Sequence, residues 1–230
     1  MFDSCQTDLR ADIRPLVSAA VTHTVSRALT ARRRLSMLLK RLFDMGCALA
    51  ALIVLAPALL AIAIAVAIET PGPVLFRQRR TGQGGKVFRI LKFRTMTVTE
   101  DGDVIRHASK NDKRVTRVGA FLRETSLDEL PQLFNILLGD MSVVGPRPHA
   151  LAHDTHYGAL LPRYVDRFAV RPGLTGFAQV QGLRGEIHDI DCMARRVDAD
   201  VHYAASWSFR SDLLLILRTF PMLIKRVNAY

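Results

Sequence analysis

An uncharged apolar run from Met45 to Ile68 constrains the fold of this chain more than any other feature. The run is about as long as the roughly 20 residues that a helix needs to cross a bilayer, so one transmembrane pass is the first interpretation. Pro57 lies in its middle, where it removes one helical hydrogen bond and bends the helix or divides it into two halves. Each half is too short to cross alone, which favours a helix that enters and leaves a membrane on the same side.

Basic residues flank both ends of the apolar run. Arg32, Arg33, Arg34, Lys40 and Arg41 precede it, and Arg77, Arg79 and Arg80 follow it. The positive-inside rule predicts that such flanks stay in the cytoplasm. Two positive flanks therefore favour the re-entrant helix, although proline bends also occur in helices that span a membrane. Charge and proline alone leave both interpretations open.

Composition indicates a protein of a membrane surface. The 230-residue chain carries 32 basic and 21 acidic residues, a net charge of +11. A soluble nucleic-acid binder could share that charge but would not need the apolar run, so we expect an anionic membrane partner and no nucleic acid. The three cysteines, Cys5, Cys47 and Cys192, have neither a disulfide pattern nor metal-ligand spacing, which fits a reducing compartment.

The stretch from Arg123 to Pro148 contains the residues most suited to catalysis. Asp128 and Glu129 are adjacent carboxylates that can hold a hard cation, and one of them can attack phosphorus. The alternative is an ordinary amphipathic helix with an acidic first turn capped by Ser126. The basic residues around the pair, and the rigid turn that ends at Pro148, favour phosphoryl transfer.

Two short alternating runs between Val74 and Met96 surround a glycine-rich turn and predict a β-hairpin. The turn is not a Walker loop, because Arg80 and Val87 occupy positions where that motif requires Gly and Ser or Thr. Alternation places Lys92 and Arg94 on one strand face, where they could bind phosphate, or could simply be solvated.

The segment from Arg171 to Glu186 is a second dense motif. Its glycines allow close backbone approach to a ligand, and Arg171 and Arg184 could pair with a phosphate or a sugar carboxylate; a plain loop is the alternative. Further on, the apolar and basic residues from Trp207 to Val227 predict an interfacial helix with a tryptophan anchor, or else a core-packing helix.

Three histidines invite comparison with a zinc site, but their spacing argues against one. A helix that starts after Pro148 would separate His149 from His156 by roughly 10 Å along its axis, which is too far for both to bind one ion. His153 could share an ion with only one of them, and no nearby Cys or Glu completes the ligand set. We therefore expect a polar helix face here.

From about Lys40 to Tyr230 the chain resembles the bacterial sugar transferases of the small, monotopic phosphoglycosyl transferase superfamily. Six collinear blocks carry the resemblance: Lys40-Arg41-Leu42-Phe43-Asp44, Pro71-Gly72-Pro73-Val74, Lys92-Phe93-Arg94-Thr95-Met96, Ser126-Leu127-Asp128-Glu129-Leu130-Pro131-Gln132, residues 139–148 and Arg171-Pro172-Gly173-Leu174-Thr175-Gly176. The tail from Gly173 onward resembles the branch that acts on hexose 1-phosphates, with glucose preferred over galactose. Many of that branch have an N-terminal domain with further membrane spans, so this chain is expected to be a minimal form or a fragment.

The resemblance implies an α-rich α+β fold in a monotopic membrane protein with a re-entrant helix broken at Pro57. The expected parts are a poorly ordered or peripheral segment 1–35, a basic flank and membrane helix 36–70, and a cytoplasmic catalytic domain 71–230 with an interfacial C-terminal helix. The family often has Ser before the proline, whereas Ala56 stands here, so a hydroxyl cannot help to set the bend. The expected location is the cytoplasmic face of the bacterial inner membrane.

The resemblance also implies a reaction. Asp128 would attack the β-phosphate of a UDP-hexose, releasing UMP, and undecaprenyl phosphate would then take the phosphosugar from the aspartate. Asp128 and Glu129 would hold Mg²⁺. Arg123 is expected to act with these two carboxylates in catalysis. The basic residues expected to bind the substrates are Lys92, Arg94, Arg147, Arg171 and Arg184.

These expectations place the protein at the first membrane step of exopolysaccharide or related glycan synthesis. Inner-membrane lipids are expected partners, and a homodimer is a further expected partner state. Two alternatives remain open. One is a non-catalytic membrane adaptor of a glycan-assembly complex. The other is a polytopic transferase that forms no covalent intermediate.

Overall fold

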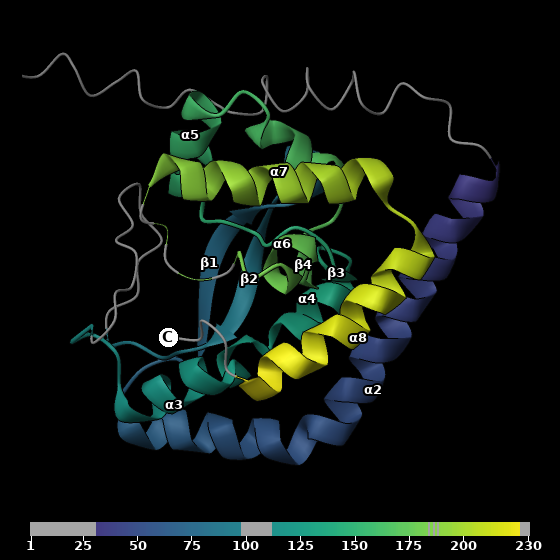
Figure 1. The fold of residues 1–230 in the computed structure, drawn as a ribbon. Helices are drawn as coiled ribbons and strands as arrows, with labels where there is room; N and C mark the ends of the chain where they lie inside the picture. Colours follow the sequence, from purple (N-terminus) through teal and green to yellow (C-terminus); the bar gives the residue numbers. More distant parts are fainter. Residues whose placement is uncertain (1–30, 98–111, 184, 186, 188, 226–230) are drawn as a thin grey trace, which may run out of the picture.

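A computed structural model describes residues 31–97, 112–183, 185, 187 and 189–225, and shows an α-rich α+β fold (Figure 1). The elements in chain order are α2 (Ala31–Glu69), β1 (Leu75–Thr81), η1 (Gln83–Gly85), β2 (Val87–Phe93), α3 (Arg117–Thr125), η2 (Leu127–Glu129), α4 (Gln132–Leu138), β3 (Ser142–Val144), α5 (Leu151–Leu160), η3 (Tyr164–Ala169), β4 (Gly173–Thr175), α6 (Phe177–Val180), α7 (Ile190–Ser206) and α8 (Phe209–Lys225). Arg184 and most of the expected lead-in segment lie outside the described residues.

Helix α2 begins at Ala31, before the basic cluster, and contains Pro57. Figure 1 shows it bent into two arms, as the proline predicts. From Arg34 to Glu69 it is long and apolar enough to cross a membrane by length and composition. Val54 and Ile68 are 76% and 80% exposed, so much of its apolar surface is uncovered by the rest of the chain. Together these features indicate association with a membrane.

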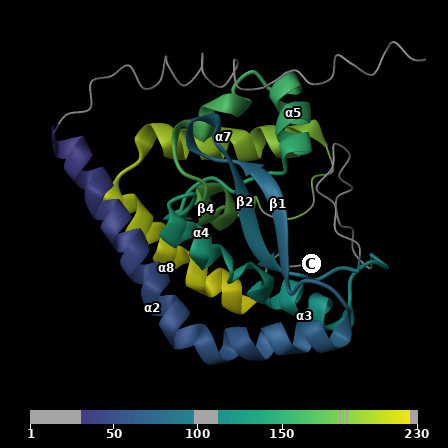
Figure 2. The ribbon, with the colours of Figure 1, turned by 180° about the vertical axis from the view of Figure 1, so that it is seen from behind.

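Both arms of α2 also pack on the rest of the described chain. Ala48 joins a core cluster with residues of β2 and α4, and Val66 joins a second cluster with Phe93 and Leu122. Helices α3 and α4 lie along α2, as Figure 2 shows from behind. The membrane helix is therefore an integral part of the domain rather than a separate anchor.

The predicted β-hairpin is confirmed. Strands β1 and β2 pair antiparallel from Leu75 opposite Phe93 to Thr81 opposite Val87. Gly84 and Gly85 in the turn have φ values of 65° and 79°, which residues with a Cβ adopt only at a cost. The turn glycines are therefore explained by backbone geometry.

A second, parallel pair brings together two segments that the sequence analysis treated separately. Ser142 of β3 pairs with Gly173 of β4, and Val144 pairs with Thr175. The turn that follows β3 presses directly on the Arg171–Thr175 segment. A Cβ at Gly145 would lie 2.2 Å from the carbonyl oxygen of Arg171.

The C-terminal helix α8 has a packed face and an exposed face. Leu215 is buried with Val144 and Tyr203, whereas Leu214 and Leu217 are exposed. The indole of Trp207 donates from Nε1 to Asp212 at 3.0 Å, so its polar end is used within the protein. Helix α8 thus packs on the domain, and the interfacial role of its exposed leucines stays a prediction.

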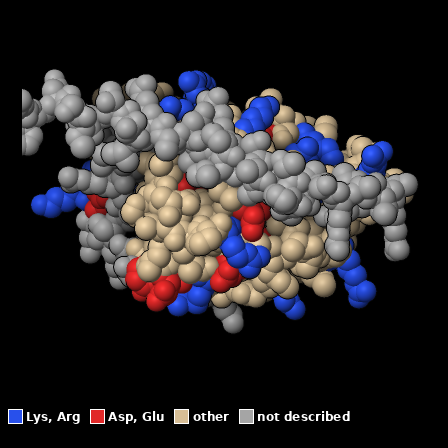
Figure 3. All heavy atoms as spheres, turned by 90° about the horizontal axis from the view of Figure 1, so that it is seen from above, with Lys and Arg blue, Asp and Glu red and all other residues tan. Residues whose placement is uncertain are grey.

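Charge on the described surface is mixed. On the face seen from above the view of Figure 1, acidic and basic side chains lie close to one another rather than forming one basic area (Figure 3). The excess of basic residues is therefore not gathered on the visible part of that face. Two of the basic residues, Lys92 and Arg147, lie instead against the two adjacent carboxylates described next.

Candidate active site

The carboxylates of Asp128 and Glu129 project from η2, a single turn between α3 and α4. Ser126 creates this turn by adopting a left-handed conformation with φ 59°, which is unusual for a residue with a side chain. Its side chain does not cap the turn; the backbone reversal ends α3 and turns the next residues inward. The alternative of a helix capped by Ser126 is therefore wrong.

Glu129 is held by two cations from distant parts of the chain. Lys92, at the end of β2, donates from Nζ to Oε1 at 2.8 Å. Arg147, in the turn after β3, binds both carboxylate oxygens, with Nη1 3.1 Å from Oε2. Burial alone would raise the pKa of Glu129, but the charges and hydrogen bonds of Arg147 and Lys92 outweigh it and hold that pKa well below its ordinary value.

Asp128 differs from its neighbour. It is 9% exposed, and its side chain accepts no hydrogen bond within the described part of the chain; Lys92 Nζ approaches Oδ2 only to 3.9 Å. Burial raises the pKa of Asp128, the charge of Lys92 opposes that shift, and the adjacent charge of Glu129 adds to it. One carboxylate is thus fixed as an anion while the other keeps its lone pairs free, an asymmetry that suits a nucleophile beside a charge-holding partner.

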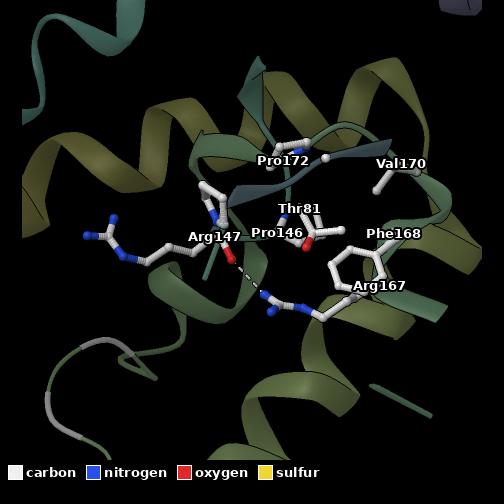
Figure 4. Close-up of a pocket in the computed structure, with 9 residues that line it drawn as sticks. Thr81, Pro146, Arg147, Arg167, Phe168, Val170 and Pro172 are labelled. Atoms are coloured by element: carbon white, nitrogen blue, oxygen red, sulfur yellow. Dashed lines mark hydrogen bonds between the residues drawn. The ribbon is translucent and has the colours of Figure 1, made fainter. Parts of the chain in front are cut away.

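The turn that carries Arg147 is held on its inner side by Arg167. The guanidinium of Arg167 donates to the carbonyl oxygen of Arg147 at 2.7 Å and to Asp200 at 2.6 Å (Figure 4). Figure 4 also shows the Arg147 side chain pointing away from the small pocket beside Phe168. Because Arg167 holds the backbone carbonyl of Arg147, the Arg147 side chain can extend from the other side of the turn to Glu129.

Other basic residues from the sequence analysis lie elsewhere. Arg94 donates to the carbonyls of Val66 and Pro71 at the end of α2, at 3.3 and 3.0 Å. Arg171 donates from Nε to the carbonyl of Gly139 at 3.1 Å, beyond the end of α4. Arg123 acts on Asp128 only through its charge, which lowers the pKa of that aspartate as a minor contribution. The structure thus brings Lys92 and Arg147 to the carboxylates.

The histidines near Pro148 also have structural partners. His149 is buried, with Nδ1 2.7 Å from the hydroxyl of Tyr164, which in turn donates to Asp154 at 2.7 Å. Burial and the charge of Arg167 hold the pKa of His149 well below its ordinary value. These groups form a buried polar network under the Arg147 turn.

The sequence profile of the bacterial sugar transferases matches residues 35–226, a range that includes most of α2, both carboxylates and every described element of the site. The chain belongs to the bacterial sugar transferase family. This sugar transferase is 52% identical over 191 residues to a UDP-glucose:undecaprenyl-phosphate glucose-1-phosphate transferase of Caulobacter vibrioides, covering 83% of the chain and 72% of that protein.

Two longer relatives are also named as undecaprenyl-phosphate sugar-phosphate transferases. A UDP-glucose:undecaprenyl-phosphate glucose-1-phosphate transferase of Escherichia coli is 48% identical over 182 residues, 79% of the transferase chain. An undecaprenyl-phosphate galactose phosphotransferase of Salmonella typhimurium is 36% identical over 217 residues, 86% of the chain. The matches span 39% and 43% of those two proteins, so the transferase corresponds to less than half of each.

Two further arginines of the transferase, close enough to Arg147 for the charges to interact, were not identified as site residues from the sequence. Arg80, on β1, has its pKa lowered to about 10, first by burial and then by the charge of Arg147. Arg196, on α7, is 6% exposed, and its pKa is lowered by the same two causes in the same order. A charged residue on the apolar face of an amphipathic helix was the available signal, since Arg196 shares the buried face of α7 with Met193 and Val197.

Proposed function

We propose that this sugar transferase moves hexose 1-phosphate from a UDP-hexose to undecaprenyl phosphate, with Asp128 as the nucleophile. The observation that carries the proposal is the asymmetry of the adjacent carboxylates: Glu129 is bound by Lys92 and Arg147, whereas Asp128 has no hydrogen-bond donor among the described residues. The named activities of the Caulobacter and Escherichia coli relatives supply the substrate classes and favour glucose, with galactose as the other candidate hexose.

The proposed reaction has two displacements at one phosphorus atom. A carboxylate oxygen of Asp128 forms a bond to the β-phosphorus of the donor, and the bond to the bridging oxygen breaks, so that UMP leaves with the electron pair. An oxygen of undecaprenyl phosphate then forms a bond to the same phosphorus, and the aspartate leaves as a free carboxylate. Two steps allow a soluble donor and a lipid acceptor to use the same nucleophile in turn.

Lys92 and Arg147 have two roles in this proposal. They keep Glu129 ionised, and their positive charges at the two carboxylates would attract the phosphate groups of a substrate. Guanidinium groups suit phosphate because they offer paired donors in a plane. Arg123 adds long-range positive charge, which favours the ionised form of Asp128.

The donor set fits Mg²⁺. A nearby cation would bind the free lone pairs of Asp128 and would lower the raised pKa of its carboxyl. Mg²⁺ suits this place because it accepts one or two carboxylates together with substrate phosphates. Asp128 and Glu129 would hold the ion, which when bound would neutralise charge on the diphosphate. The residues of this chain would still orient the donor and position the nucleophile.

The bent helix α2 suggests where the reaction occurs. We propose that its two arms enter and leave the cytoplasmic leaflet of the inner membrane on one side, which would put the active site at the membrane surface within reach of a lipid phosphate. Single cysteines placed before Lys40 and after Pro73 in a cysteine-free background test this. Labelling of both from the cytoplasmic side is expected, and labelling from opposite sides would mean a transmembrane pass.

A labelling experiment tests the nucleophile directly. The protein is incubated with UDP-glucose or UDP-galactose carrying ³²P at the β-phosphate, with Mg²⁺ and without lipid acceptor. We expect UMP release and stable label on the wild type and on Asp198→Asn, a control at an exposed aspartate of α7, but no label on Asp128→Asn. A label that survives in Asp128→Asn would overturn the assignment, and a wild type without label or transfer would favour the adaptor.

A further inference from the structure

Arg80 and Arg196 are two arginines whose charges act on Arg147, the residue that binds Glu129. Neither forms an ion pair with any residue in the described ranges. Arg80 donates from Nη1 to the carbonyl of Pro148 at 3.2 Å and also binds Gln78. Arg196 donates from Nη2 to the carbonyl of Gly185 at 3.1 Å. The buried Nε of each has no hydrogen-bond partner.

Both arginines converge on Arg147 from different elements. Arg80 reaches the carbonyl of Pro148, the residue that follows Arg147. Arg196 lies one helical turn before Asp200 on α7, and the Arg167–Asp200 pair ties that part of α7 to the carbonyl of Arg147. The charge of Arg147 lowers the pKa of Arg80 and of Arg196, which independently indicates that the three guanidinium groups repel one another.

The charges around the two carboxylates do not balance. Lys92, Arg80, Arg147, Arg167 and Arg196 carry five positive charges, against four on Asp128, Glu129, Asp154 and Asp200. Arginines are rarely buried without an anionic partner, because a buried charge costs free energy unless it is paired. The remaining excess of positive charge favours a bound anion, such as a diphosphate or a phosphate monoester.

We infer that Arg80 and Arg196, together with Arg147, form an anion subsite that binds phosphate oxygens of a substrate. The inference rests on the proposed function and adds two residues to it. Either the diphosphate of the sugar nucleotide or the phosphate of the lipid acceptor could supply the anion, and both present the oxygens that guanidinium groups bind in pairs.

The test compares two adjacent arginines of α7 in the full-length protein. Arg196→Gln removes the buried charge, and Arg195→Gln removes the same charge from the exposed face. Dissociation constants for UDP and for a short-chain prenyl monophosphate are measured by calorimetry, without turnover. Arg196→Gln should weaken at least one of these ligands by about tenfold or more, the loss typical of a charged hydrogen bond, and Arg195→Gln should weaken neither.

Stability separates this role from a structural one. Since burial and the charge of Arg147 both disfavour the charged form of Arg196, and outweigh the opposite charge of Asp200, Arg196→Gln should leave the unfolding temperature unchanged or raise it. If Arg196 serves only to hold the carbonyl of Gly185, the unfolding temperature should fall while both affinities stay at the wild-type value, which would overturn the inference. Arg80→Gln, with exposed Arg79→Gln as its control, gives a second and independent measurement.

The pattern of losses identifies the ligand. Weaker UDP binding assigns the subsite to the donor, and weaker prenyl phosphate binding assigns it to the acceptor. Unchanged affinity for both ligands in Arg196→Gln and Arg80→Gln overturns the subsite even if the wild type transfers sugar phosphate. A wild type that transfers no sugar phosphate would instead overturn the proposed function.

Discussion

Arg94 donates from Nη1 to the carbonyl oxygen of Pro71 at 3.0 Å, which joins the residue after β2 to the segment after the bent helix α2. The same guanidinium donates to the carbonyls of Val66 and Thr70, so it ties the last turn of the helix to the residues that follow it. With Arg94 only 5% exposed, these bonds connect the membrane helix to the catalytic domain in a mostly dry environment.

Arg94→Met is therefore expected to lower stability and not substrate affinity. Loss of a buried charged donor that serves three carbonyls should cost roughly 3 kcal/mol, seen as a lower unfolding temperature of the detergent-solubilised protein. The KM for UDP-glucose of the enzyme that remains folded should match the wild type. Arg89→Met, on the exposed face of β2, is the control. A raised KM with normal stability would instead restore Arg94 to the substrate site.

The acidic limb of the pH profile should report Asp128. Its pKa lies above the ordinary value of 3.8, mainly through burial, and only the ionised carboxylate can attack, so kcat/KM should fall as pH drops through that raised pKa. The charge of Lys92 opposes the shift, so Lys92→Met should move the acidic limb to higher pH and also lower the rate. Lys86→Met, at the exposed start of the same hairpin strand, should leave the limb in place. An unmoved limb in Lys92→Met would mean that another group titrates.

Gly173 of β4 should tolerate no side chain, because it lies directly against the turn after β3. A Cβ at Gly173 would lie 2.0 Å from the amide nitrogen of Gly145, well inside van der Waals contact. Gly173→Ala should therefore displace the turn that carries Arg147 and reduce sugar-phosphate transfer by about a hundredfold or more, because positioning by this turn sets the site geometry.

Gly46→Ala is the matched control for that change. Gly46 lies inside α2 with nothing within 4 Å of an added Cβ, so alanine should leave transfer unchanged and stabilise the helix by about 0.5–1 kcal/mol. Equal activity of both variants in the transfer assay would show that the turn adapts.

Asp154 should make stability depend on pH. Burial raises its pKa from 3.8 to about 6, against the opposing charge of Arg167. A carboxyl with a raised pKa contributes stability that is fully present below its unfolded pKa and is lost as pH rises through the folded value. Asn at this position stays neutral, so the unfolding free energy of Asp154→Asn relative to the wild type should rise by up to about 3 kcal/mol between pH 4 and 7.

Denaturant unfolding at the two pH values measures this effect, with Asp198→Asn as the exposed control. The asparagine can still accept from the hydroxyl of Tyr164, which donates to Asp154 at 2.7 Å in the wild type. If the stability difference is the same at both pH values, the folded protein holds Asp154 ionised throughout.

Features that depend on neighbours along the chain were predictable. The bend follows from Pro57 in an apolar run, and the hairpin from alternation around Gly84 and Gly85. The pattern after Pro148 predicts a helix from Leu151 to at least Pro162, and the helix is present but ends at Leu160. The adjacency of Asp128 and Glu129 is likewise a property of the sequence. Each of these requires only that a few consecutive residues adopt one backbone geometry.

The choice of cations around the carboxylates was decided by the tertiary structure. Lys92 and Arg147 are 37 and 18 residues from Glu129, and only the packing of β2 and the β3 turn against η2 brings them to it. Arg94, two residues from Lys92, lies past the end of the strand and binds α2 instead. A chain with 32 basic residues has many ways to surround two carboxylates, and long-range packing selects among them.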